Sequence, residues 1–306
     1  MKWYFAINEQ GVREGLGLHA QLAVLSALRV GGLEPVLLYW GQRGAFTEWM
    51  QARGVRVVDQ GLPFADPIAA AEAAGRYPAN HFGHWLRTQV CLIEHDAAFV
   101  LYTDVDVVFL KRPDLDGLRP AGFAAAPEFL PANWNYFNAG VMLLNVAALR
   151  EDYAAFESYI REHLAAPDSA AFNDQFAYND FYRRRWTRLP LVYNWKPYWP
   201  VNTGARLLHL HGPKIGHILT MMDGGWDWAS DFGAQVGGMF ASHVDGYIHC
   251  LRAVLDVLGP DAFEGRADVE RIIADAPAYV RSLPRERTGA ALPNIRMFGD
   301  GWVPPV

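Results

Sequence analysis

The feature that most limits the possible fold is the alternation of short apolar runs with helix-period segments over residues 3–58. The apolar runs are 3–8, 35–40 and 55–58, and the segments with apolar residues at helical spacing are 16–30 and 45–53. Glycines follow both helical segments, as is common at helix ends. Strands and helices that alternate in this way form a parallel sheet covered on both faces. The sequence therefore predicts an α/β fold with a mostly parallel sheet.

The same alternation continues along the chain until about Gly216, where the composition and the pattern of apolar residues change. Further strands are expected at 97–102, 140–146 and 205–210, and further helices at 84–94, 147–164 and 173–184. The segment 223–238 is rich in Gly, Trp and Asp, and helical periodicity returns at 246–258 and 267–283. We therefore expect a main domain over residues 1–215. Residues 216–306 should form a mainly helical C-terminal extension that serves the acceptor site, packing or an oligomer contact.

Composition excludes several classes of protein. The 306 residues carry a formal net charge of -6, so the chain lacks the basic footprint of a nucleic-acid-binding protein or of electrostatic attachment to an anionic membrane. The first residues do not read as a signal peptide, and no apolar run is long enough to span a bilayer. We expect a cytoplasmic protein, peripheral at most at the inner face of the membrane. The two cysteines, Cys91 and Cys250, lie in apolar helix-like stretches and are expected to be buried free thiols.

Two carboxylates interrupt a long apolar run near the middle of the chain. Asp104 and Asp106 lie within the run 99–110, where unpaired charge is costly to bury. In open α/β sheets, ligands bind beyond the carboxyl ends of the strands. A hard divalent cation, Mn²⁺ or Mg²⁺, held together with a diphosphate fits two carboxylates at that place. The alternative is that the two acids cap the next element or pair with Lys111 and Arg112.

The residues around this pair resemble those of a known family. The segment 101–106, LYTDVD, looks like the metal-binding D-x-D of GT-A glycosyltransferases, and is most similar to glycosyltransferase family 8. Three further segments resemble motifs of that family in the same order: 137–145 (FNAGVMLLN), 173–179 (NDQFAYN) and 208–214 (LHLHGPK). Residues 193–195 (YNW) look like its short Y-N segment. The resemblance covers about residues 1–215 and implies the GT-A fold, a Rossmann-like mixed sheet.

The resemblance also implies the ligands of the metal. Asp104 and Asp106 would bind it with His209 as the third protein ligand, since imidazole suits a manganese-like ion. His211 lies on the same face of the predicted strand, but the H-x-x-G spacing selects His209. Lys214 would neutralise the donor diphosphate as the leaving group departs. This sequence has one residue fewer than the family between Gly212 and the lysine.

Other residues receive roles only through the resemblance. It implies that Asp174 holds hydroxyls of the donor sugar and that Gln175 lies near the anomeric carbon, both counted as catalytic with Lys214. In the bacterial enzymes of the family, the residue after this glutamine is often acidic. This sequence has Phe176 at that position, so this candidate nucleophile is missing. The implied donor-binding residues, apart from Lys214, are Asn8, Arg87, Asp104, Val105, Asn138, Ala139, Gly140 and Gly212.

The sequence thus predicts a metal-dependent glycosyltransferase that acts with retention. The expected donor is a nucleoside-diphosphate sugar, a UDP-sugar by resemblance, and the acceptor a carbohydrate or glycolipid. A homo-oligomer is possible. A sugar-1-phosphate nucleotidyltransferase is an alternative, but it should carry a Gly-rich phosphate loop after the first strand, and 9–15 (EQGVREG) is a poor version. A non-catalytic nucleotide-sugar or glycan-binding protein is the other alternative.

Overall fold

The computed structural model describes residues 1–77, 79–166, 172–260, 263–295, 297, 304 and 305. The main sheet has seven strands in the order β3-β2-β1-β4-β7-β6-β8. These strands are β1 (Lys2–Asn8), β2 (Glu34–Trp40), β3 (Arg56–Asp59), β4 (Phe99–Thr103), β6 (Phe123–Pro127), β7 (Phe137–Asn145) and β8 (Thr187–Arg188). A separate ladder joins β5 (Val107–Phe109) to β9 (Leu207–His209).

The main sheet is mixed and mostly parallel, as predicted. Strand β1 runs parallel to both β2 and β4, β2 to β3, and β6 to β8. Strand β7 runs antiparallel to its neighbours β4 and β6. From β1, the chain builds β2 and β3 on one side of the sheet and places β4 on the other. The carboxyl ends of β1 and β4 therefore meet at the switch point where ligands bind in open α/β sheets.

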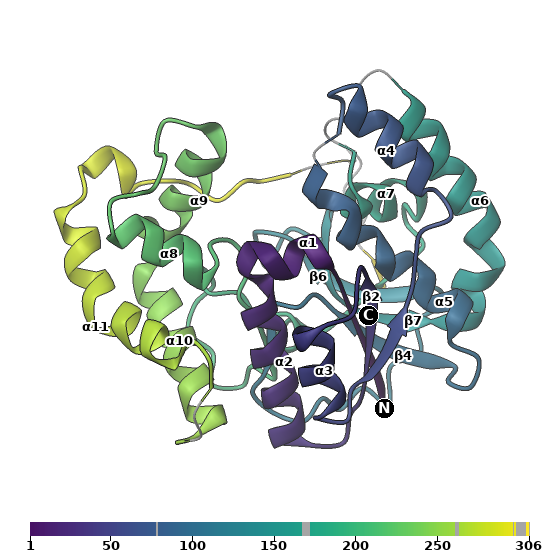
Figure 1. The fold of residues 1–306 in the computed structure, drawn as a ribbon, viewed down its shortest axis with the longest axis horizontal. Helices are drawn as coiled ribbons and strands as arrows, with labels where there is room; N and C mark the ends of the chain where they lie inside the picture. Colours follow the sequence, from purple (N-terminus) through teal and green to yellow (C-terminus); the bar gives the residue numbers. More distant parts are fainter. Residues whose placement is uncertain (78, 167–171, 261–262, 296, 298–303, 306) are drawn as a thin grey trace.

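Helices cover both faces of the sheet because successive side chains of a strand point to opposite sides. On β1, Trp3, Phe5 and Ile7 pack in one apolar cluster with residues of α2 (Gly17–Val30) and α3 (Ala45–Gln51). Tyr4 and Ala6 pack in the opposite cluster. That second cluster draws on α4 (Ala65–Ala73), α5 (Val90–Ile93), α6 (Val146–Ala165) and α7 (Asp174–Phe181), of which α4, α6 and α7 lie together on the right of Figure 1.

Most predicted elements are present within a few residues of their expected limits. The predicted helix 84–94 differs, because the structure forms a 3-10 helix (Ala79–Gln89) followed by the single turn of α5. The predicted strand 205–210 is β9, which pairs with β5 outside the main sheet. Between β1 and α2 lie the short α1 (Glu9–Gly11) and a π-helical turn (Val12–Leu16) in which Gly15 has φ of 92°.

The C-terminal part is helical, as predicted. It contains α8 (Ile215–Met222), α9 (Asp231–Ser242), α10 (Val244–Leu258) and α11 (Arg266–Ser282), which gather beside α2 on the left of Figure 1. Short 3-10 turns lie at Leu191–Tyr193 and Arg285–Arg287. Both cysteines are buried and free, as expected. Among the helices that the structure describes, none combines the length and hydropathy needed to cross a bilayer.

Candidate active site

The short ladder between β5 and β9 brings the two aspartates and a histidine together. Asp104 and Asp106 follow β4, and Val107, the next residue, pairs with His209 in antiparallel register. One ligand atom from each of Asp104, Asp106 and His209 lies within 4.8 Å of the others. His209 Nε2 is 3.2 Å from Asp106 Oδ1. Two segments that are far apart in the sequence thus converge beyond the carboxyl end of β4.

A chain of hydrogen bonds determines which nitrogen of His209 carries the proton. The Glu128 carboxylate can only accept, so Asn138 Nδ2 donates to it at 2.6 Å, and Asn138 Oδ1 accepts from the Gly140 N–H at 3.0 Å. Asn194 Nδ2 donates to Asn138 Oδ1 at 2.9 Å. Asn194 Oδ1 then lies 3.0 Å from His209 Nδ1, which must be the protonated nitrogen. The lone pair of His209 Nε2 is therefore directed at the two aspartates.

The electrostatics of the cluster favour a neutral imidazole beside an ionised carboxylate. Burial lowers the pKa of His209, and the charge of Asp106 opposes this only in part. Burial alone would raise the pKa of Asp106, but Lys214 and His209 outweigh it and hold that pKa well below its ordinary range. A neutral imidazole nitrogen and two carboxylates form a suitable ligand set for Mn²⁺ or Mg²⁺.

Gly140 leaves space where these groups meet. A Cβ at this position would lie 2.3 Å from His209 Cε1 and 2.9 Å from Asp104 Oδ2. The Gly140 carbonyl also accepts the Asp104 N–H at 2.7 Å, which ties the end of β4 to β7. The absence of a side chain at Gly140 therefore allows Asp104 and His209 to approach each other.

Arg87 joins two of the predicted site residues behind the cluster. Its NH2 atom is 2.7 Å from Asp104 Oδ1, and its Nε is 2.7 Å from Asp174 Oδ2. The guanidinium also donates to the Ala139 carbonyl and lies over the Tyr102 ring at 4.9 Å. Burial alone would lower the pKa of Arg87, but the two aspartates outweigh it and raise that pKa. Arg87 is thus a fixed internal cation that holds Asp104 and Asp174 in place.

Lys214 lies on the other side of the cluster. Its ammonium group contacts Asp106 Oδ2 and lies 3.2 Å from the Leu210 carbonyl. The loop that carries it is held by the C-terminal helices, since Tyr247 of α10 donates to the His211 carbonyl at 2.8 Å. Gly212 in this loop has φ of 93°, and a Cβ there would lie 2.5 Å from Tyr247 Oη. Gly212 therefore shapes the loop rather than opening space beside the cluster.

Gln175, on α7, borders the site through the backbone of β7. Its Oε1 accepts from the Ala139 N–H at 2.9 Å and lies 3.2 Å from Asn138 Nδ2. The carbonyl end of this amide is thus occupied by the protein, and the side chain also makes a hydrogen bond to Tyr136. Val105 lies between the two aspartates, but its side chain packs in the core with α2 and α3, so only its backbone borders the site.

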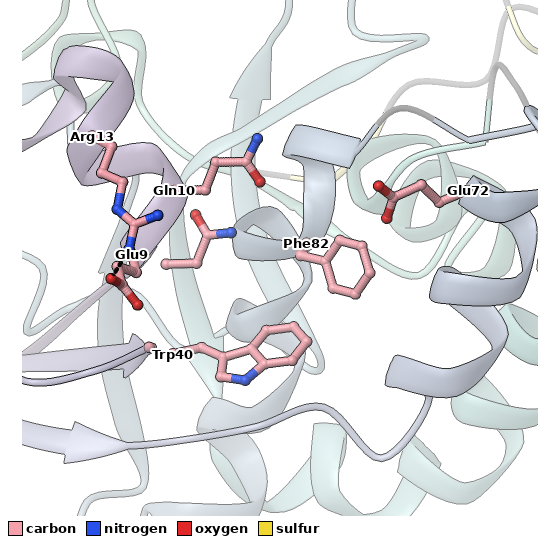
Figure 2. Close-up of a pocket in the computed structure, with 8 residues that line it drawn as sticks. Glu9, Gln10, Arg13, Trp40, Glu72 and Phe82 are labelled. Carbon is pink, nitrogen blue, oxygen red and sulfur yellow. Dashed lines mark hydrogen bonds and ion pairs between the residues drawn. The ribbon is translucent and has the colours of Figure 1, made fainter.

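Asn8 is the predicted site residue that lies apart from the cation cluster. It borders a cavity of about 330 Å³ beyond the carboxyl ends of β1 and β2. In Figure 2, the rings of Trp40 and Phe82 point toward this cavity, and Gln10 and Arg13 project from the helical turn after β1. The centroids of the two rings are 5.2 Å apart, and the ring planes are inclined at 51° to each other. Asn8 Oδ1 accepts from the Gly11 N–H at 3.0 Å, so the carbonyl end of this amide caps the turn that follows β1.

Several residues of the site were missed by the sequence analysis. Glu128, at the end of β6, contacts His211 Nε2 at 3.1 Å as well as Asn138. Burial alone would raise the pKa of Glu128, but its partners outweigh it and lower that pKa to about 2. Asn194 lies in the Y-N segment, so the resemblance contained a signal for it. Glu128 had none, because its partners come from β7 and from the loop after β9.

No family model matches this chain, and no curated protein matches it in sequence. Among solved structures, the galactosyltransferase LgtC in complex with donor and acceptor sugar analogues is 18% identical, with a TM-score of 0.54. That match covers 88% of this chain and 100% of LgtC. An active-site mutant of LgtC is also 18% identical, covers 79% of this chain and 96% of its own, and has a TM-score of 0.51.

A more distant match extends over part of a longer protein. The glycosyltransferase GlyE of Streptococcus pneumoniae is 18% identical, with a TM-score of 0.49. The match covers 68% of this chain and 53% of GlyE, so this chain spans about half the length of that protein. The comparison with LgtC establishes the fold: the chain has a GT-A fold that resembles glycosyltransferase family 8, as its sequence predicted.

Proposed function

We propose that this protein is a metal-dependent glycosyltransferase that transfers a sugar from a nucleoside-diphosphate donor, a UDP-sugar, to a hydroxyl group of a carbohydrate or glycolipid. One observation carries the proposal: Asp104, Asp106 and His209 converge within 4.8 Å beyond the carboxyl end of β4, with the Lys214 ammonium beside them. Two carboxylates, a neutral imidazole and a partly exposed lysine are suited to a diphosphate that binds through a divalent cation.

The residues of the chain would divide the work of the reaction. Mn²⁺ or Mg²⁺ held by the three ligands would neutralise charge on the leaving diphosphate. Lys214 would donate to a diphosphate oxygen as the bond between the sugar and the diphosphate breaks. Asp174 and the amide nitrogen of Gln175 would hold the donor sugar at the wall formed by β7 and α7. Positioning and charge stabilisation would supply most of the rate enhancement.

Retention is the outcome that the resemblance implies, and Phe176 directly after Gln175 removes one carboxylate that could act as a nucleophile in a double displacement. The acceptor hydroxyl would attack the anomeric carbon on the face from which the diphosphate leaves. The new carbon–oxygen bond forms as the old one breaks, and the hydroxyl proton passes to a phosphate oxygen of the leaving group. Glu128 does not replace the missing nucleophile, because its two oxygens are engaged by Asn138 and His211.

The cavity at Asn8 would hold the nucleoside. Trp40 and Phe82 offer aromatic faces to a base, and Asn8 Nδ2 offers a donor at the end of β1. The cavity lies next to the switch point between β1 and β4, where ligands bind in open α/β sheets. A single donor molecule would therefore place its base in this cavity and its diphosphate beside Asp104, Asp106 and His209. Of the cavity's three charged side chains, Glu9 and Arg13 are paired with each other, and Glu72 is the third.

A screen of nucleoside-diphosphate sugars for release of nucleoside diphosphate tests the proposal. We expect release with Mn²⁺ or Mg²⁺, none in excess chelator, and a loss of at least about a hundredfold in Asp104→Ala and Asp106→Ala with unchanged circular dichroism. Turnover that persists in chelator would refute the metal-dependent reaction. Donor binding without release in the presence of acceptors would assign the protein to the class of binding proteins.

A further inference from the structure

The two carboxylates of the cation cluster each have a cationic partner, but the partners are held differently. Arg87 is enclosed by Asp104, Asp174 and the Ala139 carbonyl, and its side chain is 5% exposed. Lys214 reaches Asp106 from the surface with a side chain that is 22% exposed. Its ammonium group contacts the Asp106 carboxylate and the Leu210 carbonyl. Arg87 is therefore a structural cation, whereas Lys214 can exchange partners.

The contacts of the carboxylate oxygens of Asp104 and Asp106 show which basic side chain would be displaced by a bound divalent cation. Arg87 occupies Asp104 Oδ1, while Asp104 Oδ2 faces the space that Gly140 leaves open. Asp104 can thus bind a cation without releasing Arg87. On Asp106, Oδ1 faces His209 and Oδ2 is taken by Lys214. A divalent cation at this carboxylate and the ammonium group compete for the same charge in a buried place, where two cations repel strongly.

We propose that Lys214 and the divalent cation compete for Asp106, and that cation binding drives the lysine onto the donor diphosphate. This inference rests on the proposed function and adds a coupling between its two ligands. Lys214 would weaken binding of the cation alone and strengthen binding of the diphosphate once the cation is present. Coupling between two ligands is reciprocal. The factor by which the cation tightens diphosphate binding is therefore also the factor by which the diphosphate tightens cation binding.

The geometry of the loop supports exchange by side-chain rotation alone. The Tyr247 hydroxyl holds the His211 carbonyl, and the Ile215 N–H points at His19 Nε2, 3.4 Å away. Both contacts fix backbone on either side of Lys214. The four-carbon side chain is left as the part that moves, and lysine is the flexible point charge suited to such a movement.

Lys214→Met tests the competition because it removes the ammonium group and keeps the apolar stem. Mn²⁺ binding without nucleotide is measured by electron paramagnetic resonance, and UDP binding at saturating Mn²⁺ by calorimetry. We expect Mn²⁺ alone to bind at least about tenfold more tightly to the variant than to the wild type, since a charge within contact distance is removed. UDP with Mn²⁺ should bind about 10- to 100-fold more weakly, since a charge-assisted hydrogen bond is lost.

Lys111→Met is the matched control. Lys111 lies just beyond β5, where its ammonium group donates to the Thr203 carbonyl, so the control removes one positive charge outside the site. We expect it to leave both affinities within about twofold of the wild type. Lys214→Arg, which keeps the competing charge, should keep the weak cation binding of the wild type. If Lys214→Met is poorly folded, Lys214→Gln gives the same readout.

The outcomes separate the inference from the proposed function. Mn²⁺ that binds to Lys214→Met no more tightly than to Lys111→Met overturns the exchange, while the proposed function stands if Asp106→Asn abolishes cation binding. Failure of the wild-type protein to bind Mn²⁺ either alone or with UDP overturns both.

Discussion

At the scale of single residues, the site depends on an absent side chain as much as on the ligands. Three groups meet around Gly140: the His209 ring, Asp104 Oδ2 and Asn138 Oδ1. The resemblance counted this glycine among the donor-binding residues. In the structure, its missing Cβ leaves room for the side chains of Asp104 and His209 to converge.

Gly140→Ala should therefore damage cation binding directly. The new Cβ would meet His209 Cε1 at 2.3 Å, so the ring or the strand must shift. Because small displacements around metal ligands cost 10- to 100-fold in affinity, we expect a loss of Mn²⁺ affinity of about that size, measured by titration. Gly216→Ala, on α8 with nothing within 4 Å of its Cβ, is the control and should bind Mn²⁺ normally. Equal affinities for the two variants would contradict the prediction.

Lys196 is a second residue whose surroundings determine its chemistry. It is buried beside Trp199 and donates to the Pro127 carbonyl at 2.7 Å. Burial lowers its pKa from 10.5 to about 7, opposed in part by the charge of Glu128. The unfolded chain therefore binds more protons than the folded chain between these two values, so this residue's contribution to stability rises with pH across that window.

The expected result is a pH-dependent difference between Lys196→Met and the wild type. Methionine does not titrate, so the difference in the free energy of unfolding should favour the variant most near and below pH 7. It should shrink steadily as the pH rises toward 10.5. Urea unfolding of both proteins from pH 6 to pH 10 measures it. A difference that stays constant would show that the folded-state pKa of Lys196 is not lowered.

At the scale of elements, the loop between β9 and α8 joins the two parts of the molecule. It carries Lys214, yet its conformation is determined by side chains of other elements. Tyr247 of α10 holds the His211 carbonyl, and Met239 of α9 lies against Gly212. The chemistry of the cation site therefore depends on helices that contribute no ligand to it.

Tyr247→Phe isolates this dependence. The variant keeps the buried ring and loses the hydrogen bond to the His211 carbonyl, which costs about 1 kcal/mol. We expect Mn²⁺ alone to bind as in the wild type, and UDP with Mn²⁺ to bind about fivefold more weakly, because Lys214 is less well positioned. In the Lys214→Met background the same change should have no effect on UDP binding. A fivefold loss there would mean that Tyr247 acts by another route.

At the scale of the whole molecule, the C-terminal helices share an apolar core with the GT-A fold. Leu22 of α2, Val108 of β5 and Leu208 of β9 pack in one cluster with residues of α8, α10 and α11. Each of the three side chains is at most 1% exposed. The helices α8, α10 and α11 therefore pack against α2, β5 and β9 rather than standing apart from them.

A chain cut after Lys214 should consequently fail to fold stably. Exposure of these three side chains would cost about 5–9 kcal/mol, which is comparable to the roughly 5–15 kcal/mol that stabilises a typical domain. We expect the truncated chain to aggregate, whereas the intact chain should unfold in one urea transition seen equally by fluorescence and circular dichroism. A soluble, monomeric truncated chain with native near-ultraviolet dichroism would contradict the shared core.

The sequence by itself determined the elements and their order, because local periodicity records which face of each helix or strand is buried. It also pointed to Asp104 and Asp106, since two charges within an apolar run require a partner. Elements without strong periodicity were less well predicted, and the segment 84–94 became mostly 3-10 helix where Arg87 and Trp85 are buried.

Only the tertiary structure decided what each site residue touches. The pairing of β5 with β9 places His209 rather than His211 at the aspartates, and it brings Glu128 to His211 instead. The proton on His209, the loop that carries Lys214 and the cavity at Asn8 all depend on contacts between segments far apart in the chain. Such contacts leave no local pattern in a sequence, because they arise from packing and hydrogen bonding that exist only after the chain has folded.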